Sequence, residues 1–400
     1  AAMISETILN VVTALSRGRG RARENPGVRP GPLLGRPELA DDLVADQAQY
    51  TGKTVLITGA GGSIGTELCR QVLACRPARL VLFELNEFAL YTVELGLRSA
   101  AARAGVALEQ VLGSVTEAPQ ITRALARFGV QVVLHAAAYK HVSLVEANPL
   151  AGIRNNVLGT HVLARAALAQ RVERFILISS DKAVRPANVM GATKRLAELV
   201  VQDLAGRPSE TQFSIVRFGN VFGSSGSVVA RFEAQIRAGG PVTVTHPEVT
   251  RYFMTVEEAA RLVLQAGALA RGGEVYVLEM GPPVPIVCLA RRMIAAAGQH
   301  VRESATPDDG ISIVFTGLQP GEKLREDLSL SGAYAPTAHP KIFRVEEPHL
   351  SELEVASCLR ALQEVVAEGG PDRARALLQR WVEGYAAPGS VTSARQRQVH

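Results

Sequence analysis

One pattern constrains this chain more than any other: from Thr54 onward, short apolar runs alternate with longer segments of helix length. The runs are uninterrupted and have the length of strands: TVLIT (54–58), LVLFE (80–84), VVLHA (132–136), FILIS (175–179) and FSIVR (213–217). Strands that are apolar on both faces and separated by helices form parallel sheets covered on both sides. The sequence therefore predicts an α/β fold, a doubly wound parallel sheet of the Rossmann type.

A glycine pattern, Gly59-x-x-Gly62-x-x-Gly65, follows the first of these runs and precedes a segment of helix length. Amide groups at a helix N-terminus can receive a pyrophosphate, and glycines let the main chain approach it closely. Glu84 ends the second run, where a carboxylate accepts hydrogen bonds from ribose hydroxyls and repels a 2′-phosphate. No arginine directly follows Glu84. A tight turn without a ligand is the weaker alternative, and the pattern predicts a site for NAD in preference to NADP.

The pattern of the sequence changes after Phe218, where loops rich in Gly and Pro alternate with short helices and strands. Such a pattern indicates a smaller lobe that closes over the open end of the sheet. We predict four parts: a flexible basic segment (1–38), a NAD-binding Rossmann domain (39–218), a smaller C-terminal substrate-binding lobe with some elements that return to the sheet (219–387), and a disordered tail (388–400).

Charge and cysteine content argue against several classes of protein. The net charge is +5, and six arginines lie between Arg17 and Arg36. This stretch fits a solvated tether or peripheral contact with acidic lipid, while an aromatic content of 5% argues against nucleic-acid binding. No apolar run is long enough to span a bilayer, and no secretory signal appears. The four cysteines lack the spacing of disulfides or zinc ligands, so we predict a cytoplasmic protein without a metal site.

Eight motifs occur in order between residues 52 and 328: TGAGGSIG, LGSV, HAAAYKHVSLVEANP, NNVLGT, SSDKAVRPANVMGATKR, RFGNVFGSSGSV, TVTHPEVTRYFMT and GLQPGEKLREDL. Together they resemble the UDP-N-acetylglucosamine 4,6-dehydratases of bacterial polysaccharide biosynthesis, in the extended short-chain dehydrogenase/reductase superfamily. The resemblance implies NAD as cofactor, UDP-N-acetylglucosamine as substrate and a homo-oligomer. Many such enzymes carry N-terminal membrane helices and an extra domain. We therefore expect either a short form without an integral membrane segment or an excised catalytic part.

The reaction that the resemblance implies oxidises the C4 hydroxyl, removes water across C5 and C6, and returns hydride to C6. Ser180 would hydrogen-bond the C4 oxygen, Asp181 would protonate the departing C6 hydroxyl, and Lys182 would remove the C5 proton. These residues follow the strand-length run that ends at Ser179, at the edge of the sheet where ligands of such folds bind. A polar turn is the alternative interpretation.

A tyrosine normally stands four residues before the lysine of this segment, but here Met190 precedes Lys194 by four. A thioether cannot carry a proton, so the C4 proton would pass to Asp181, Lys182 or a water held by Ser180. Methionine at this position recurs in the subgroup of relatives associated with retained C5 configuration. Lys194 would hold the nicotinamide ribose hydroxyls, and Met190 would pack near the nicotinamide.

The remaining site residues follow from the glycine pattern and the resemblance. The predicted cofactor contacts are Gly59, Gly62, Ser63, Ile64, Gly65, Glu84, Asn86, Ser114, Val115, Ala136, Ala137, Ala138, Asn156 and Lys194. The predicted substrate contacts are Lys140, His141, Asn220, Ser227, Arg231, Arg251, Glu322 and Lys323. Packing explains Asn156 almost as well, and His135 is expected to be a core residue. Gln319 replaces an arginine common in relatives, which removes one positive contact.

Two alternative functions stay open. A UDP-sugar 4-epimerase needs no C5 base and generally uses the tyrosine that is absent here. A non-catalytic sensor of NAD or nucleotide sugar would tolerate that loss, but it would have no reason to keep Ser180, Asp181, Lys182 and Lys194 together. The sequence therefore favours a dehydratase.

Overall fold

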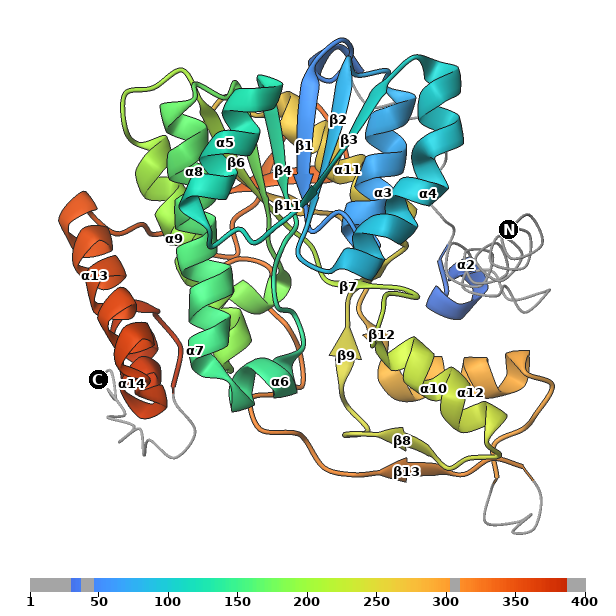
Figure 1. Cartoon of the computed structure of the whole chain (residues 1–400). Coiled ribbons are helices and arrows are strands. Elements are labelled where there is room, and N and C mark those ends of the chain that lie inside the picture. The colour runs from blue at the N-terminus through green and yellow to red at the C-terminus, as the bar shows by residue number, and fades with distance from the viewer. Residues whose placement is uncertain (1–29, 37–46, 303–309, 387–400) are drawn as a thin grey trace, which may run out of the picture.

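The computed structural model describes residues 30–36, 47–302 and 310–386 (Figure 1). Its centre is a nine-stranded sheet in the order β14-β15-β11-β6-β5-β4-β1-β2-β3. All pairs from β3 to β11 are parallel, and β15 and β14 are added antiparallel at one edge. The predicted doubly wound parallel sheet is confirmed.

The strands of this sheet span β1 (Thr54–Thr58), β2 (Arg79–Glu84), β3 (Ala107–Leu112), β4 (Val132–His135), β5 (Arg174–Ile178), β6 (Gln212–Arg217), β11 (Val275–Leu278), β14 (Ala335–Pro336) and β15 (Ile342–Val345). Five of them match the apolar runs within one residue at either end. The runs did not reveal β3, because its sequence ALEQVL is partly polar and the strand lies at the edge of the sheet, half-buried.

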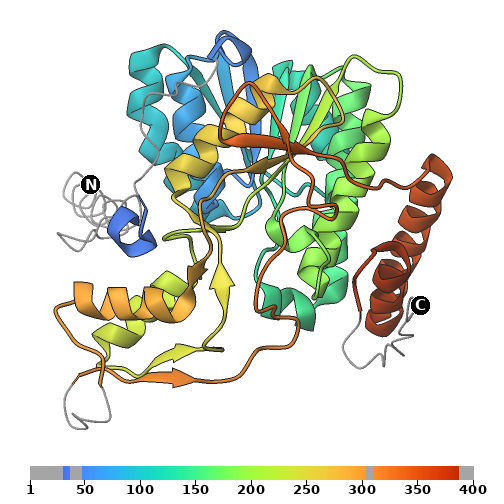
Figure 2. The same cartoon turned by 180° about the vertical axis from the view of Figure 1, so that it is seen from behind.

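Helices cover both faces of the sheet (Figures 1 and 2). One face packs against α3 (Ser63–Ala74), α4 (Glu87–Ala104) and α11 (Val256–Leu269). The other packs against α5 (Ala118–Phe128), α8 (Gly159–Ala169) and α9 (Val189–Ala205). Each layer has its own apolar core, as expected for strands that are buried on both sides.

A smaller lobe lies beyond the carboxyl ends of the parallel strands, joined to the sheet through the short pair β7 (Asn220–Val221) and β10 (Phe253–Met254). It contains α10 (Val228–Arg237), β8 (Val242–Val244), β9 (Thr250–Arg251), β12 (Val284–Pro285), α12 (Ile286–Ala296) and β13 (Ile313–Phe315). These elements close around a separate apolar core.

The lobe core also holds Leu33 and Leu34 of α2 (Pro30–Leu34), each 5% exposed. Arg36 forms an ion pair with the buried Glu258, with an N–O distance of 2.7 Å. The predicted flexibility of residues 1–38 is therefore wrong for 30–36, because two leucines and an arginine find buried partners there. Residues 1–29, 37–46 and the predicted disordered tail over 388–400 lie outside the described residues.

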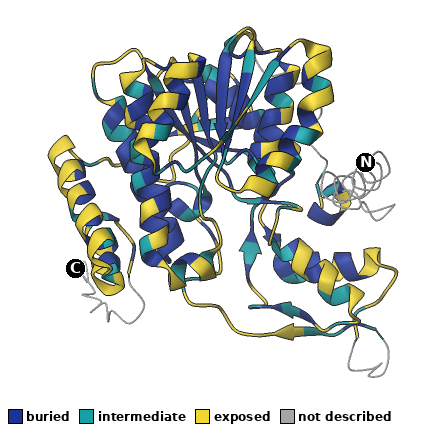
Figure 3. Cartoon of the chain, in the orientation of Figure 1, coloured by how far each residue is buried: buried dark blue, intermediate teal, exposed yellow. Residues whose placement is uncertain are grey.

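Several elements of the range 219–387 return to the sheet domain. Besides α11, β11, β14 and β15, the helices α13 (Glu352–Glu368) and α14 (Pro371–Trp381) pack on α9 and on the helical run α6 (Val142–Ala147), α7 (Pro149–Gly152) and η2 (Ile153–Leu158). The faces of α9 that meet them are buried (Figure 3). Among the helices of the described ranges, none is both long and apolar enough to cross a membrane.

Candidate active site

The glycine pattern lies at the point where the strand order of the sheet reverses, between β1 and its neighbours β2 and β4. Gly59 has φ +65°, and a Cβ atom there would lie 2.8 Å from the backbone nitrogen of Ala137. A Cβ at Gly65 would lie 1.9 Å from the carbonyl oxygen of Gly59. Neither position has room for a side chain. In the described structure no side chain caps the N-terminus of α3, so its first amide groups face the crevice where open α/β sheets bind ligands.

Glu84 is fixed beside this turn by three backbone amide groups. Its carboxylate accepts hydrogen bonds from Gly61 (3.0 Å), Leu85 (2.9 Å) and Asn86 (3.0 Å). The carboxylate therefore stands at the carboxyl end of β2 and next to the glycine turn, as a ribose contact requires.

Other predicted cofactor residues have roles in the fold itself. Asn86 caps α4 by accepting a hydrogen bond from Ala89. Ser114 pairs with the hydroxyl of Thr116, and Val115 is buried in the core. Ala136 and Ala137 border the turn at Gly59.

Asn156 is 1% exposed, and its amide group holds the loop after β4. It accepts a hydrogen bond from the backbone of Tyr139 and donates one to the carbonyl oxygen of the same residue, at 2.8 and 3.0 Å. It also donates to Thr193 of α9. These contacts favour the packing interpretation of Asn156, which would act on a cofactor only through the loop that it positions.

The predicted catalytic segment forms a short 3-10 turn, η3 (Asp181–Ala183), separated from the end of β5 by two residues. The Ser180 hydroxyl donates to Asp181 Oδ1 at 2.9 Å, and Lys182 Nζ donates to the same oxygen at 3.1 Å. Asp181 is fully buried, and its second oxygen, Oδ2, has no hydrogen-bond partner in the described part of the chain. A buried carboxyl oxygen without a partner is costly unless it carries a proton or meets a ligand.

Two lysines approach this turn. Lys182 Nζ also donates to Asn220 Oδ1 at 2.9 Å, so the predicted substrate residue Asn220 lies within the same cluster. Lys194 Nζ donates to the carbonyl oxygen of Ile178 at 2.6 Å, and burial lowers the pKa of Lys194 to about 8. The structure thus brings together Ser180, Asp181, Lys182 and Asn220, with Lys194 at the end of β5.

Met190 is 3% exposed and belongs to the apolar cluster between α9 and the helices α13 and α14. Its neighbour Gly191 lies against the turn η3, where a Cβ atom would be 2.2 Å from the carbonyl oxygen of Lys182. The sequence analysis did not single out this glycine, although it allows α9 to begin next to the turn.

A buried charge network is hydrogen-bonded to Ser179, the residue before Ser180. Glu198 accepts hydrogen bonds from Ser179 (2.6 Å) and from two nitrogens of Arg217 (2.8 and 2.6 Å), and Arg217 also pairs with Glu347 (2.9 Å). Burial alone would raise the pKa of Glu198, but the charge and hydrogen bonds of Arg217 outweigh it and lower that pKa to about 2. No sequence motif indicates this network, because its members are far apart in the chain.

His135 confirms its expected role as a core residue. Its Nδ1 lies 2.7 Å from the Thr58 hydroxyl and its Nε2 lies 2.9 Å from the Thr160 hydroxyl. Burial lowers the pKa of His135 to about 3, so the ring stays neutral at physiological pH.

In the smaller lobe, Arg251 and Glu322 meet at an N–O distance of 3.2 Å, and Arg251 is 8% exposed. Lys323 donates to the carbonyl oxygen of Val184, just after the turn η3. Two other predicted substrate residues lie apart from these contacts. Ser227 caps α10 by accepting from Ala230, and Arg231 is exposed on the same helix.

The loop 222–227 bridges two parts of the predicted site. The amide group of Ser225 donates to the Ser63 hydroxyl at the start of α3, at 3.2 Å. At Gly226 a Cβ atom would lie 2.4 Å from the ring of His141, which together with Lys140 is exposed on the loop after β4. The loop therefore reaches from the glycine turn to the predicted sugar side.

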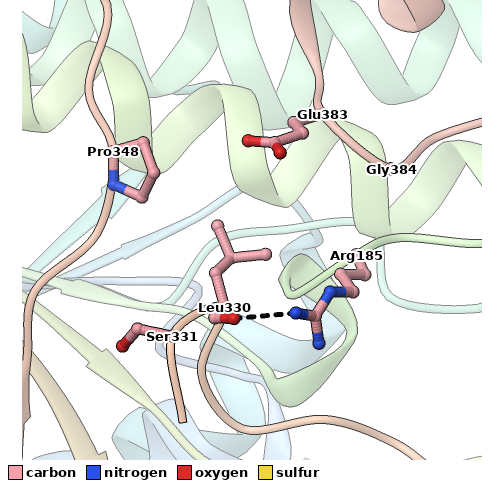
Figure 4. A pocket seen from close by; sticks show the side chains of 6 residues that line it. All are labelled: Arg185, Leu330, Ser331, Pro348, Glu383 and Gly384. Carbon is pink, nitrogen blue, oxygen red and sulfur yellow. Dashed lines mark hydrogen bonds between the residues drawn. The ribbon is translucent and has the colours of Figure 1, made fainter. Parts of the chain in front are cut away.

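A separate pocket of about 300 Å³ is lined in part by Arg185, which follows η3. Figure 4 shows its lining residues, with Glu383 and Gly384 at the top, Pro348 at the upper left, and Ser331, Leu330 and Arg185 below them. Arg185 has φ +40° and donates to the carbonyl oxygen of Leu330 at 2.7 Å. The residues lining this pocket do not include Asp181 or Lys182, so it is distinct from the predicted catalytic cluster.

The fold and the glycine turn define the class: a Rossmann-fold protein of the extended short-chain dehydrogenase/reductase type. The X-ray structure of Pen from Bacillus thuringiensis matches this chain with 31% sequence identity and a TM-score of 0.67. The match covers 76% of this chain and 92% of Pen. DesIV from Streptomyces venezuelae, a dTDP-glucose 4,6-dehydratase solved with NAD and TYD bound, is 21% identical with a TM-score of 0.59. That match covers 79% of this chain and 98% of DesIV, and at this identity it shows the fold alone.

The chain belongs to the polysaccharide biosynthesis protein family, whose model matches residues 55–347. It is 47% identical to the capsular polysaccharide biosynthesis protein CapD of Staphylococcus aureus, over 81% of this chain and 53% of CapD. The chain thus spans about half the length of CapD. A UDP-glucose 4-epimerase of Rickettsia canadensis is 31% identical over 70% of this chain and 78% of the relative. A UDP-N-acetylglucosamine 4,6-dehydratase (inverting) of Campylobacter jejuni is 29% identical over 69% and 77%.

Proposed function

We propose that this chain dehydrates UDP-N-acetylglucosamine to the UDP-4-keto-6-deoxy sugar with NAD as resident cofactor. The observation that carries the proposal is the pair Asp181 and Lys182 at the carboxyl edge of the sheet. One oxygen of the fully buried Asp181 is bonded to Ser180 and Lys182, and the other has no partner within the described residues. Elimination of water needs both an acid and a base, whereas epimerisation at C4 needs neither at C5 or C6.

The residues of the glycine turn fit NAD. The absence of room for a Cβ at Gly59 and Gly65 and the uncapped N-terminus of α3 suit a pyrophosphate, and Glu84 suits an unphosphorylated ribose. NAD, when bound, would accept hydride from C4 and return it to C6. Lys194, at the end of β5, would hold the nicotinamide ribose hydroxyls.

The chain's own groups would move the protons. The C4 ketone acidifies the C5 proton, which passes to the Lys182 amine, and the electrons of the C5–H bond form the C5–C6 double bond. The C6–O bond breaks, and the leaving hydroxyl takes the Asp181 proton and departs as water. When hydride returns to C6, C5 takes a proton back from Lys182, which has exchanged with solvent. The proton released by oxidation at C4 would pass to Asp181, Lys182 or a water held by Ser180. Ser180 would hold the C4 oxygen, while Arg251 and Lys323 would face the diphosphate. A positioned acid or base contributes about 10² to 10⁴ in rate.

The test is turnover of UDP-N-acetylglucosamine in deuterated water, with the product analysed by mass and NMR. We expect loss of one water and deuterium at C5, and the NMR spectrum also reports the C5 configuration. Asp181→Asn and Lys182→Ala should each lose roughly 10² to 10⁴ in rate. Lys53→Ala is the matched control. Lys53 lies just before β1 and pairs with Glu173, at the amino ends of the strands and away from the predicted site, so this variant should keep full activity.

The second candidate is a UDP-sugar 4-epimerase, which the match to the Rickettsia epimerase supports. It predicts a product of unchanged mass with inverted C4 and no deuterium at C5. Unchanged substrate would instead favour a sensor. Homo-oligomerisation, a cytoplasmic location and peripheral membrane contact through the basic N-terminal residues stay predictions of the sequence.

A further inference from the structure

A second carboxylate faces the catalytic lysine from the segment that follows the smaller lobe. Glu326 is 9% exposed, and its Oε1 lies 3.9 Å from Lys182 Nζ. Its other oxygen, Oε2, lies 3.5 Å from Lys323 Nζ. The Lys182 amine therefore has Asp181 and Asn220 at hydrogen-bond distance and Glu326 within ion-pair distance.

The same short segment is joined to both sides of the predicted site. Lys323 donates to the carbonyl oxygen of Val184 at 2.9 Å, two residues after Lys182. Glu322 pairs with Arg251 and accepts a hydrogen bond from Thr245 of the lobe at 2.9 Å. Glu326 is therefore held in place by a segment that is bonded to the catalytic turn and to the lobe.

We propose that Glu326 is a positioning residue for the proton abstraction by Lys182, an inference that rests on the proposed dehydration. Lysine has a long flexible stem, so the direction of its amine depends on the acceptors around it. Asp181 gives up its proton during the elimination and so changes its own charge. Glu326 takes no part in the proton transfers of the proposed step, and its carboxylate lies within ion-pair distance of the amine from the other side.

Glu326 also acts on the charge that develops during the step. As the C5 proton moves to the Lys182 amine, that nitrogen gains a positive charge inside a largely buried cluster, where Lys182 is 18% exposed. A fixed anion about 4 Å away stabilises the charge far more than it would in water. Glu326 thus lowers the barrier of the elimination without touching the sugar.

Glu326→Gln tests the inference, because it keeps the shape of the side chain and removes its charge. We expect kcat for dehydration to fall about 10- to 100-fold, with KM changed by less than about threefold. Oxidation at C4 does not need Glu326, so reduced nicotinamide should accumulate on addition of substrate and be visible by its absorbance. Exchange of the C5 proton with solvent should slow in proportion to kcat.

Asp327→Asn is the matched control. Asp327 is the next residue in the chain, is exposed, and lies 3.8 Å from Lys323, but it makes no ion pair with Lys182 in the described structure. The control variant should behave as the wild type. Glu326→Asp is a second variant that keeps the charge, and it should recover part of the lost rate. A Glu326→Asp enzyme as slow as Glu326→Gln would overturn the inference.

A double mutant separates this inference from the proposed function. If Glu326 acts through Lys182, adding Glu326→Gln to Lys182→Ala should cause no further loss in rate. A slow Lys182→Ala enzyme together with a Glu326→Gln enzyme as fast as the Asp327→Asn control would reject the inference alone. A Lys182→Ala enzyme with wild-type turnover would reject the proposed function.

Discussion

Replacing Gly65 with alanine puts a methyl group where the structure has no room for one. The new Cβ would lie 1.9 Å from the Gly59 carbonyl oxygen and 2.7 Å from its carbon. Carbon and oxygen approach no closer than about 3.3 Å even in weak hydrogen bonds. The start of α3 would thus have to move by more than 1 Å (roughly, from the difference between these distances) away from the turn.

The turn cannot yield in compensation, because Gly59 itself has φ +65° and already lies against the backbone of Ala137. Overpacking of this kind costs about 1 to 3 kcal/mol, and with fixed backbone on both sides we expect the upper end for Gly65→Ala. The displaced amide groups of α3 should also lose the bound dinucleotide.

Gly96→Ala is the control, and we expect it to raise the free energy of unfolding instead of lowering it. Gly96 lies inside α4, and a Cβ there would meet nothing within 4 Å. Alanine in a helix interior is more favourable than glycine by about 0.5 to 1 kcal/mol. Urea unfolding followed by circular dichroism, with the dinucleotide extracted and quantified for each variant, measures both effects. A Gly65→Ala protein as stable as Gly96→Ala, with its dinucleotide retained, would refute the argument about the turn.

Three further predictions concern other parts of the chain. Met190→Leu conserves volume within an apolar cluster, so it should cost less than about 1.5 kcal/mol and keep substantial activity; an inactive, folded variant would place Met190 in the chemistry. Removal of residues 1–29 should leave turnover unchanged, whereas removal of 1–36 should lower the thermal midpoint because it takes Leu33 and Leu34 out of the lobe core; equal midpoints would contradict this. The lowered pKa of Glu198 contributes stability that is present above pH 4.5 and lost as pH falls toward 2, so the gap in unfolding free energy between the wild type and Glu198→Gln should narrow over that range in urea titrations.

The local pattern of the sequence determined the parts of this protein that depend on near neighbours. Apolar runs identified five strands of the sheet, since a strand that is buried on both faces carries apolar side chains on both. The spacing Gly59, Gly62 and Gly65 placed a ligand turn after β1, because only glycine leaves room for a backbone approach of this kind. The order of Ser180, Asp181 and Lys182 after a strand placed them at the edge of the sheet.

Side chains that can serve either the fold or a ligand were decided only by the tertiary structure. Asn86 and Ser227, both predicted as ligand contacts, each cap a helix, because a short polar side chain before a helix can accept from its unpaired amide groups. Their contacts with a ligand stay predictions. Asn156 holds the backbone of Tyr139 in the same way. The spacing of residues does not distinguish a contact with the protein's own backbone from a contact with a ligand. Which backbone groups lie near the side chain depends on how the whole chain folds.

The partners of Lys182, the proposed base, depend on contacts between distant segments. Glu326 and Asn220 reach Lys182 from positions far along the chain, and Glu198 pairs with Arg217 across α9 and β6. The burial of Met190 under α13 and α14 likewise follows from where the C-terminal helices pack. Charges and apolar faces find partners through packing of the whole chain, so their local sequence shows that a partner is needed but not which residue supplies it.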